Sequence, residues 1–190
     1  MKNILKLLLT FTITISAMAQ NTPELNIEGK VPTFSGLDDN GNKWNSANIT
    51  SSFLVVYFYP AAMTGGCTAQ ACAYRDDKVT FDKMGVTIIG VSGDEVANLK
   101  HFKESSQLNF PLLSDTNGNI AKTFGVPTKE GGSITRDING ENFLLTRGIT
   151  ASRWTFVLDK DRKIIYKNAE VNAAEDSKKV LEIIKNYNKN

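Results

Sequence analysis

Residues 53–92 read FLVVYFYPAAMTGGCTAQACAYRDDKVTFDKMGVTIIGVS. The segment opens with a run of seven apolar residues, rich in β-branched and aromatic side chains, that stops at Pro60, and it closes with a second apolar run at 86–92. Both runs are typical of strands buried on both faces of a sheet. The residues between them, 68–84, have helical composition and are followed by a glycine. The segment therefore predicts a strand–helix–strand unit with a right-handed parallel crossover.

The rest of the chain predicts further short elements around this unit. We expect strands at 33–37, 110–115, 154–158 and 163–166, and helices from Asp94 to about Leu108, at 119–124 and at 173–187. Asp94 is the expected cap of its helix. Residues 127–148 are rich in Gly, Thr and charge and predict a long loop or loose hairpin. The pattern predicts an α/β sandwich with a mixed central sheet flanked by helices.

The N-terminus has the layout of a secretory signal. Lys2 and Lys6 precede an apolar run at 7–15, and small residues follow before Gln20. The run is shorter than the roughly 20 residues that cross a bilayer, which disfavours a membrane anchor. We therefore expect 1–19 to be a cleaved signal peptide and 20–190 to be one periplasmic or secreted domain, with no stable membrane association after cleavage.

The charge balance argues against nucleic-acid binding. The chain has a formal net charge of +2, and removal of the expected signal would take away two Lys and no acidic residue. A neutral mature domain lacks the concentrated basic surface that nucleic acids require. Nucleic acid is therefore not an expected partner.

The chemistry is expected at the start of the helix. Cys67 lies at or near its first turn, where unpaired backbone N–H groups and the positive end of the helix dipole favour a thiolate over a thiol. Thr64 precedes it by three residues, so its hydroxyl could hydrogen-bond the thiolate or an incoming peroxide oxygen. Cys67 is thus the predicted reactive cysteine.

Cys72 follows five residues after Cys67. On a regular helix such a pair has Cα atoms about 8.7 Å apart and side chains pointing about 140° apart. A disulfide needs Cα atoms within about 7 Å. Bonding the two cysteines therefore requires the start of the helix to unwind, and Gly65 and Gly66 make that turn easy to melt.

A structural disulfide and a zinc site are the alternatives for the two cysteines. Paired cysteines in an exported protein are usually bonded, but a bridge that closes so small a ring removes little chain entropy. Structural zinc requires four ligands, and the chain has two Cys and one His. A redox-active pair is the favoured interpretation.

The pattern Pro60-x-x-x-Thr64-x-x-Cys67 resembles the active-site motif of peroxiredoxins of the AhpC/TSA superfamily. The preceding YFY and the position of Cys72 are similar to the bacterioferritin-comigratory-protein or PrxQ subgroup. The resemblance implies a thioredoxin-like fold, Cys67 as the peroxidatic cysteine, Cys72 as the resolving cysteine, and a pocket shaped by Pro60 and Thr64.

The resemblance also implies an arginine that holds the thiolate and polarises the peroxide. Arg153, at the start of the strand-like run 154–158, is in the matching place, and Arg147 is the reserve candidate. Residues 61–63 are Ala-Ala-Met where the subgroup usually carries charge, and Gly65-Gly66 replaces Pro-Gly or Pro-Val. The 127–148 stretch is longer than in the subgroup and is a candidate for the pocket rim or a partner surface.

The implied activity is thiol-dependent reduction of hydrogen peroxide and organic hydroperoxides. Cys67 becomes a sulfenic acid, Cys72 condenses with it, and a thioredoxin-like dithiol reductant opens the disulfide. No metal or organic cofactor is required. An intramolecular resolving cysteine removes the need for a dimer, so a monomer is expected.

The sequence leaves three alternative functions. A copper-delivery protein of thioredoxin fold would need His101, expected on the solvated face of a helix, to approach the cysteines. A general thiol–disulfide oxidoreductase would carry Cys-x-x-Cys, which this chain lacks. A structural protein with an inert bridge would not react with peroxide.

Overall fold

The computed structural model describes residues 26–138 and 140–189. The expected signal peptide, 1–19, lies outside the described residues. The strands are β1 (Ser35–Asp38), β2 (Lys43–Asn45), β3 (Phe53–Phe58), β4 (Val86–Ser92), β5 (Leu112–Ser114), β6 (Thr128–Ile138), β7 (Glu141–Ala151), β8 (Thr155–Asp159) and β9 (Ile164–Asn168). The helices are α1 (Gly65–Lys83), α2 (Val96–Ser105), α3 (Asn119–Phe124) and α4 (Asp176–Tyr187), with a short 3-10 turn at Ser46–Asn48.

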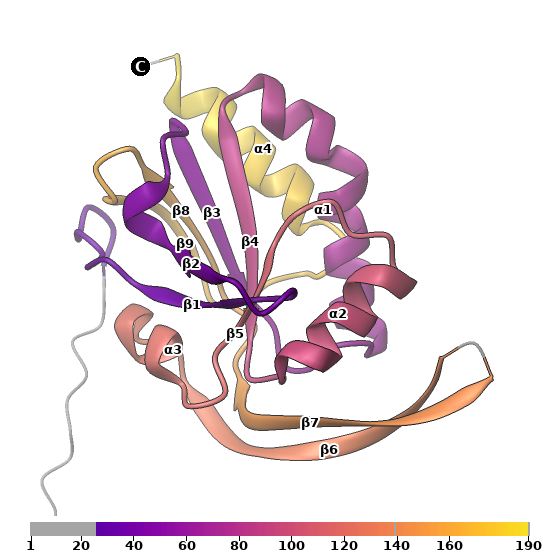
Figure 1. The fold of residues 1–190 in the computed structure, drawn as a ribbon. Coiled ribbons are helices and arrows are strands. Elements are labelled where there is room, and N and C mark those ends of the chain that lie inside the picture. Colours follow the sequence, from indigo (N-terminus) through magenta and orange to yellow (C-terminus); the bar gives the residue numbers. More distant parts are fainter. Residues whose placement is uncertain (1–25, 139, 190) are drawn as a thin grey trace, which may run out of the picture.

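The central sheet has the strand order β2-β1-β5-β4-β3-β8-β9. Strand β3 pairs in parallel with β4, and β4 with β5, whereas β1 and β8 run antiparallel to their neighbours. The predicted α/β class and mixed sheet are confirmed, and α1 is the crossover between β3 and β4 (Figure 1).

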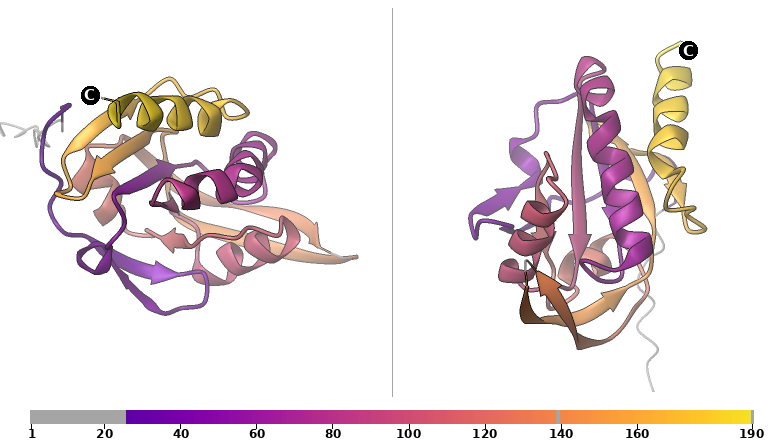
Figure 2. Two further views of the ribbon diagram at one scale, coloured as in Figure 1. Left: turned by 90° about the horizontal axis from the view of Figure 1, so that it is seen from above. Right: turned by 90° about the vertical axis from the view of Figure 1, so that its right-hand side faces the viewer.

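Strand β3 is buried on both faces, as its continuous apolar run predicts. Because side chains alternate along a strand, Val55 and Tyr57 face the core that includes α1 and α4. Val56 and Phe58 face the opposite core, which includes α3. Figure 2 shows α1 and α4 lying side by side over one face of the sheet. This packing fixes the end of β3, where the loop to α1 begins.

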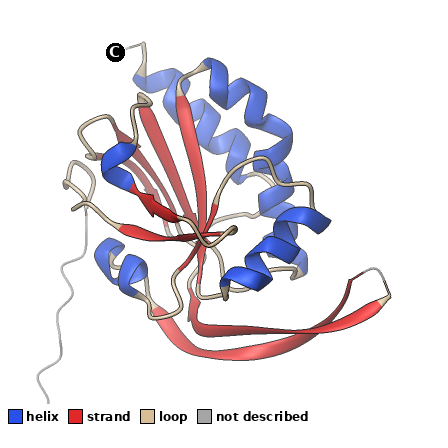
Figure 3. Cartoon of the chain, viewed as in Figure 1, coloured by secondary structure: helices blue, strands red, loops and turns tan. Residues whose placement is uncertain are grey.

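The 127–148 stretch, expected as a loop or loose hairpin, forms two long antiparallel strands, β6 and β7. They make a separate two-stranded sheet that sweeps away from the main one (Figures 1 and 3). Most side chains of β6 are exposed or half-buried, so no alternation of apolar residues marks the strand in the sequence. At its base the hairpin lies so close to the body that a Cβ on Gly93 would be 2.0 Å from the Ile149 carbonyl oxygen.

Two expected helix starts are wrong. Helix α1 begins at Gly65 rather than residue 68, and α2 begins at Val96 with Glu95 at its N-cap. Asp94 does not cap α2. It is 2% exposed, and its Oδ2 accepts hydrogen bonds from the Ala62 amide and the Ser92 hydroxyl. The Asp94 carboxylate therefore makes a tertiary contact, although the local sequence predicts that it caps α2.

Among the described residues, no helix combines the length and the apolar character needed to span a membrane.

Candidate functional site

The loop from β3 to α1 is held by hydrogen bonds at several points. It begins at half-buried Pro60, and the Ala62 amide donates to Asp94 Oδ2 at 2.8 Å. Thr64 occupies the N-cap position of α1, but its hydroxyl donates to the Ala61 carbonyl at 2.9 Å and makes no capping bond. Because the Thr64 hydroxyl proton is donated to the Ala61 carbonyl, the Thr64 oxygen can accept a hydrogen bond from a ligand.

The middle of this loop is braced by the β6–β7 hairpin. Met63 has φ of 57°, a left-handed conformation that costs energy for a residue with a side chain. Arg136 on β6 donates from Nε to the Met63 carbonyl at 3.0 Å. The hairpin therefore reaches the loop that precedes α1.

Cys67 is the third residue of α1 and only 1% exposed. Its place in the first turn is the one the sequence predicts. The first turn contains no acidic residue, and its backbone N–H groups have no partner within the helix. The sulfur thus lies at the positive end of the α1 dipole.

Arg153, in the short connection between β7 and β8, is the arginine that reaches Cys67. Its Nη2 donates to Cys67 Sγ at 3.3 Å, and its Nη1 donates to Gln70 Oε1 at 2.6 Å. A Cβ on Gly66 would lie 3.4 Å from Nη2, so a glycine leaves room for the guanidinium beside the first turn. The planar arginine fork can hold both partners at once.

Gln70 connects this arginine to a buried carboxylate. Its Nε2 donates to Asp176 Oδ2 at 2.8 Å. The same oxygen accepts from the Tyr74 hydroxyl at 2.7 Å and from the Thr155 hydroxyl at 2.7 Å. Asp176, the first residue of α4, is 3% exposed. A chain of hydrogen bonds therefore runs from Asp176 through Gln70 and Arg153 to the sulfur.

Burial raises the pKa of Asp176 above the usual value for an aspartate. The hydrogen bonds from Thr155, Tyr74 and Gln70 and the positive charge of Arg153 act in the opposite direction and stabilise the carboxylate. Burial also raises the pKa of Tyr74 well above 10, and the charge of Asp176 adds to the effect. Tyr74 thus acts as a hydrogen-bond donor to the carboxylate.

Cys72 is half-buried, and neither cysteine is in a disulfide. Both cysteines lie on the one continuous helix α1, so the helical geometry used in the sequence-based expectation applies. Disulfide formation between them requires the first turns of α1 to open.

The other candidate residues from the sequence, Arg147 and His101, lie elsewhere. Arg147, on β7, donates from Nε to the Thr150 hydroxyl at 2.9 Å and pairs through its backbone with Asp94. His101 was expected to be solvated, but it is half-buried and its ring lies 4.5 Å from that of Phe143 on the hairpin. The hairpin covers this face of α2, which the sequence of α2 could not reveal.

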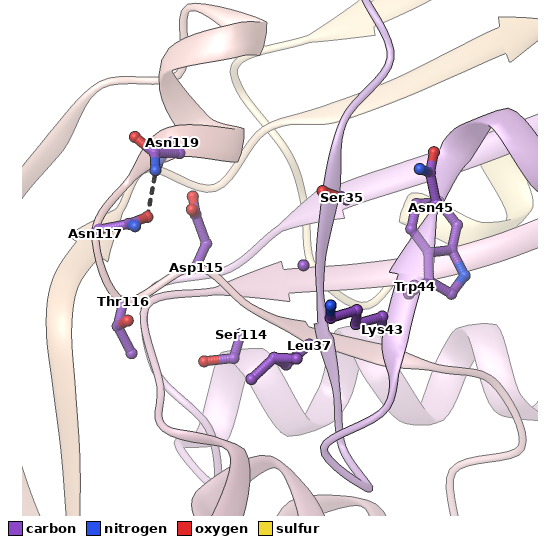
Figure 4. Close-up of a pocket in the computed structure, with 11 residues that line it drawn as sticks. Ser35, Leu37, Lys43, Trp44, Asn45, Ser114, Asp115, Thr116, Asn117 and Asn119 are labelled. Carbon is purple, nitrogen blue, oxygen red and sulfur yellow. Dashed lines mark hydrogen bonds between the residues drawn. The ribbon is translucent and has the colours of Figure 1, made fainter.

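A surface cavity of about 510 Å³ lies between the β1–β2 hairpin and the start of α3 (Figure 4). Trp44 and Lys43 line one wall, and Asn117 lines the other. The carboxylate of Asp115 is occupied by the amides of Ile120 and Ala121. Neither cysteine lines this cavity, which offers no comparable chemistry.

Sequence reasoning missed three polar residues around Cys67: Gln70, Asp176 and Arg136. Gln70 could have been found, because a residue three positions after Cys67 shares its face of a helix. Asp176 and Arg136 come from distant segments and carry no local signal. No group of three or more His, Cys, Asp or Glu side chains in the described part of the chain could hold a metal ion.

Comparison with known proteins shows what this chain is similar to. Residues 27–167 match the model of the AhpC/TSA family. Chloroplastic peroxiredoxin Q of Oryza sativa subsp. japonica is 38% identical over 135 residues, which are 71% of this chain and 55% of the rice protein. The chain thus spans about half the length of that relative. A Mycobacterium tuberculosis protein named as a peroxiredoxin is 34% identical over 80% of this chain and 90% of its own length.

Solved structures give the same result. The crystal structure of peroxidoxin BcpB from Mycobacterium tuberculosis superposes with a TM-score of 0.72 at 30% identity, covering 86% of this chain and 98% of that one. Bacterioferritin comigratory protein of Xanthomonas campestris, whose structures were described for alkyl peroxide reduction activity, has a TM-score of 0.67 at 25% identity over 81% of this chain and 91% of its own. The thioredoxin-like fold expected from the motif is confirmed.

Proposed function

Because the chain belongs to the AhpC/TSA family of peroxiredoxins, we propose that it is a thiol-dependent peroxidase whose reacting atom is Cys67 Sγ. The observation that carries the proposal is the hydrogen bond from Arg153 Nη2 to this sulfur, at 3.3 Å, at the start of a helix. A guanidinium and a helix N-terminus together place positive charge and donors where negative charge moves during the reaction.

In the first step the Cys67 thiolate attacks the hydroxyl oxygen of a hydroperoxide. An S–O bond forms as the O–O bond breaks, the second oxygen takes a proton and leaves as water or an alcohol, and Cys67 becomes a sulfenic acid. Arg153 donates to the negative charge as it moves from sulfur to oxygen. Thr64, whose own proton is bound by Ala61, accepts the O–H of the peroxide.

In the second step the start of α1 opens and the Cys72 thiolate attacks the sulfur of the sulfenic acid. The Cys67–Cys72 disulfide forms and hydroxide leaves, taking a proton to become water. A thioredoxin-like dithiol then supplies two electrons and two protons and restores both thiols. If the chain is exported, as its first 19 residues predict, this thioredoxin-like reductant receives its electrons through the membrane. We propose that the enzyme works as a monomer.

The substrates proposed are hydrogen peroxide and organic hydroperoxides. The Xanthomonas campestris relative described for alkyl peroxide reduction supports the second class.

Rapid mixing tests the proposal. The reduced protein is mixed with one equivalent of hydrogen peroxide or tert-butyl hydroperoxide, and tryptophan fluorescence and intact mass are followed. Oxidation should be orders of magnitude faster than for free cysteine and should end in an intramolecular disulfide. Cys72→Ser should keep the fast first step and stop at the sulfenic acid, whereas Cys67→Ser should lose it. Oxidation of the wild type no faster than free cysteine would refute the proposal.

A further inference from the structure

The carboxylate of Asp176 holds α1 on both sides of Cys72. Its Oδ2 accepts hydrogen bonds from Gln70, which precedes this cysteine, and from Tyr74, which follows it. All three side chains are buried, with Asp176 3% exposed and the other two fully inaccessible. One oxygen atom of α4 is thus bound to the stretch of α1 that disulfide formation must unwind.

We propose that Asp176 is a positioning residue that clasps α1: through Gln70 it fixes Arg153 against Cys67, and through Gln70 and Tyr74 it opposes the unwinding that brings Cys72 to Cys67. The inference rests on the proposed function, because it assigns Asp176 an effect on each of the two thiol steps. The clasp favours the first step and slows the second.

The effect on Arg153 follows from the two ends of the Gln70 amide. A carboxylate can only accept hydrogen bonds, so Asp176 requires the NH₂ end of the amide. The oxygen end is then turned toward Arg153, which donates to it from Nη1 at 2.6 Å. With Nη1 held there, the rigid guanidinium points Nη2 at Cys67. Asp176 therefore sets the orientation of a donor that it does not touch.

The effect on unwinding follows from the order of residues along the helix. An opening that starts at Gly65 must pass Gln70 before it reaches Cys72, and it must therefore break the bond from Gln70 to Asp176. Tyr74, which also stacks on Tyr57 with ring centroids 4.9 Å apart, anchors the next turn. Breaking hydrogen bonds to a buried carboxylate leaves polar groups without partners, which is costly.

A neighbouring contact provides a matched control. Ser177, the next residue of α4, donates to Asp77 on α1 at 2.8 Å. This bond joins the same two helices but lies beyond the segment that must unwind. Ser177→Ala should therefore weaken the helix pair without changing either thiol step.

The experiment compares Asp176→Asn, Tyr74→Phe and Ser177→Ala in the full chain. Amide hydrogen exchange of residues 67–74 is measured in the reduced protein. Cys67–Cys72 disulfide formation is driven by saturating diamide, so that closure of the disulfide rather than the first attack on diamide limits the rate, and both readouts are independent of peroxidase activity. Asp176→Asn keeps one oxygen that can accept the same hydrogen bonds but removes the negative charge that strengthens them, so it should raise exchange and the rate of disulfide formation by about tenfold. It should also slow Cys67 oxidation by peroxide and Cys67 alkylation by iodoacetamide by a similar factor.

Tyr74→Phe separates the two effects, because it removes one bond of the clasp and leaves the Gln70–Arg153 connection in place. It should speed disulfide formation and leave alkylation unchanged. The proposal is overturned if Asp176→Asn and Tyr74→Phe match Ser177→Ala in exchange and in disulfide formation. If the wild type reacts with peroxide no faster than free cysteine, the proposed function fails, while exchange, alkylation and diamide oxidation still decide whether the clasp exists.

Discussion

The two ends of helix α1 are held to the protein in different ways. The first end carries two exposed glycines and no side-chain cap, and its contacts to the rest of the protein include the hydrogen bonds of Cys67 and Gln70 with Arg153 and Asp176. The second end buries the ring of Phe81 in the core. Hydrogen bonds can break and reform locally, whereas withdrawing a core aromatic leaves a cavity. We therefore expect the helix to open from its first end, which carries Cys67.

The largest expected effect is on stability, at the second end. Phe81→Ala should lower the free energy of unfolding by about 3–5 kcal/mol, because the ring is fully buried and its removal leaves a cavity. Val79→Ala is the control on the same helix, since Val79 is 65% exposed and should cost no more than about 0.5 kcal/mol. Denaturant unfolding measures both. Equal losses for the two variants would show that this end is not held by its core contact.

The next effect is on chemistry, at the first end. Arg153→Met should slow Cys67 oxidation by about 10²–10³, the usual result of removing one donor to a developing negative charge. Arg153→Lys should recover part of the rate, because an ammonium restores the charge but cannot hold Gln70 and Cys67 together. Single-turnover stopped flow gives the rate. A large loss in Arg147→Met, with Arg153→Met unaffected, would move the assignment to Arg147.

Smaller effects are expected from the two glycines that start α1. Gly65→Ala should stabilise the helical turn by about 0.4–1 kcal/mol and slow disulfide formation roughly two- to fivefold, since no heavy atom lies within 4 Å of the added Cβ. Gly66→Ala should do the same and should also slow Cys67 oxidation, because its Cβ would contact Arg153 Nη2. Quenching the reaction at successive times and measuring the intact mass separates Cys67 oxidation from disulfide formation. Identical behaviour of the two variants would mean that the space beside Gly66 does not matter.

The smallest effect concerns pH and Asp176, which binds the first half of α1 through Gln70 and Tyr74. The pKa of Asp176 is raised in the folded protein by burial, so the folded state binds this proton more tightly than the unfolded chain. The resulting stability is present below the unfolded pKa of about 3.9 and is lost as pH rises through the raised folded value. Relative to Asp176→Asn, the wild type should therefore lose stability across that window. Asp94 and Asp115, whose pKa values are also raised by burial, are present in both proteins and cancel in the difference.

Local sequence predicted the elements that carry a clear local signal, such as a continuous apolar run or a terminating glycine. Strand β3 was recognised because both its faces are covered, and α3 because Gly125 ends it in a left-handed conformation. The hairpin strands β6 and β7 were not recognised as regular strands, because exposed faces carry no apolar alternation. Asp94 was misassigned to a helix cap because a short acidic residue before a helix has the same local signature whether or not it faces inward.

The sequence by itself determined the fold class and the place of Cys67 near the start of α1. It also determined the spacing of Cys67 and Cys72, which lets them form a disulfide only if the first turns of α1 unwind. These features depend on residues near one another in the chain, where periodicity and helix geometry are decisive. Only the tertiary structure decided that Asp176 meets Gln70 across 106 positions and that Arg136 braces Met63. Periodicity in the sequence specifies which face of a helix or strand is buried. The packing of distant elements specifies which polar groups form hydrogen bonds on that buried face.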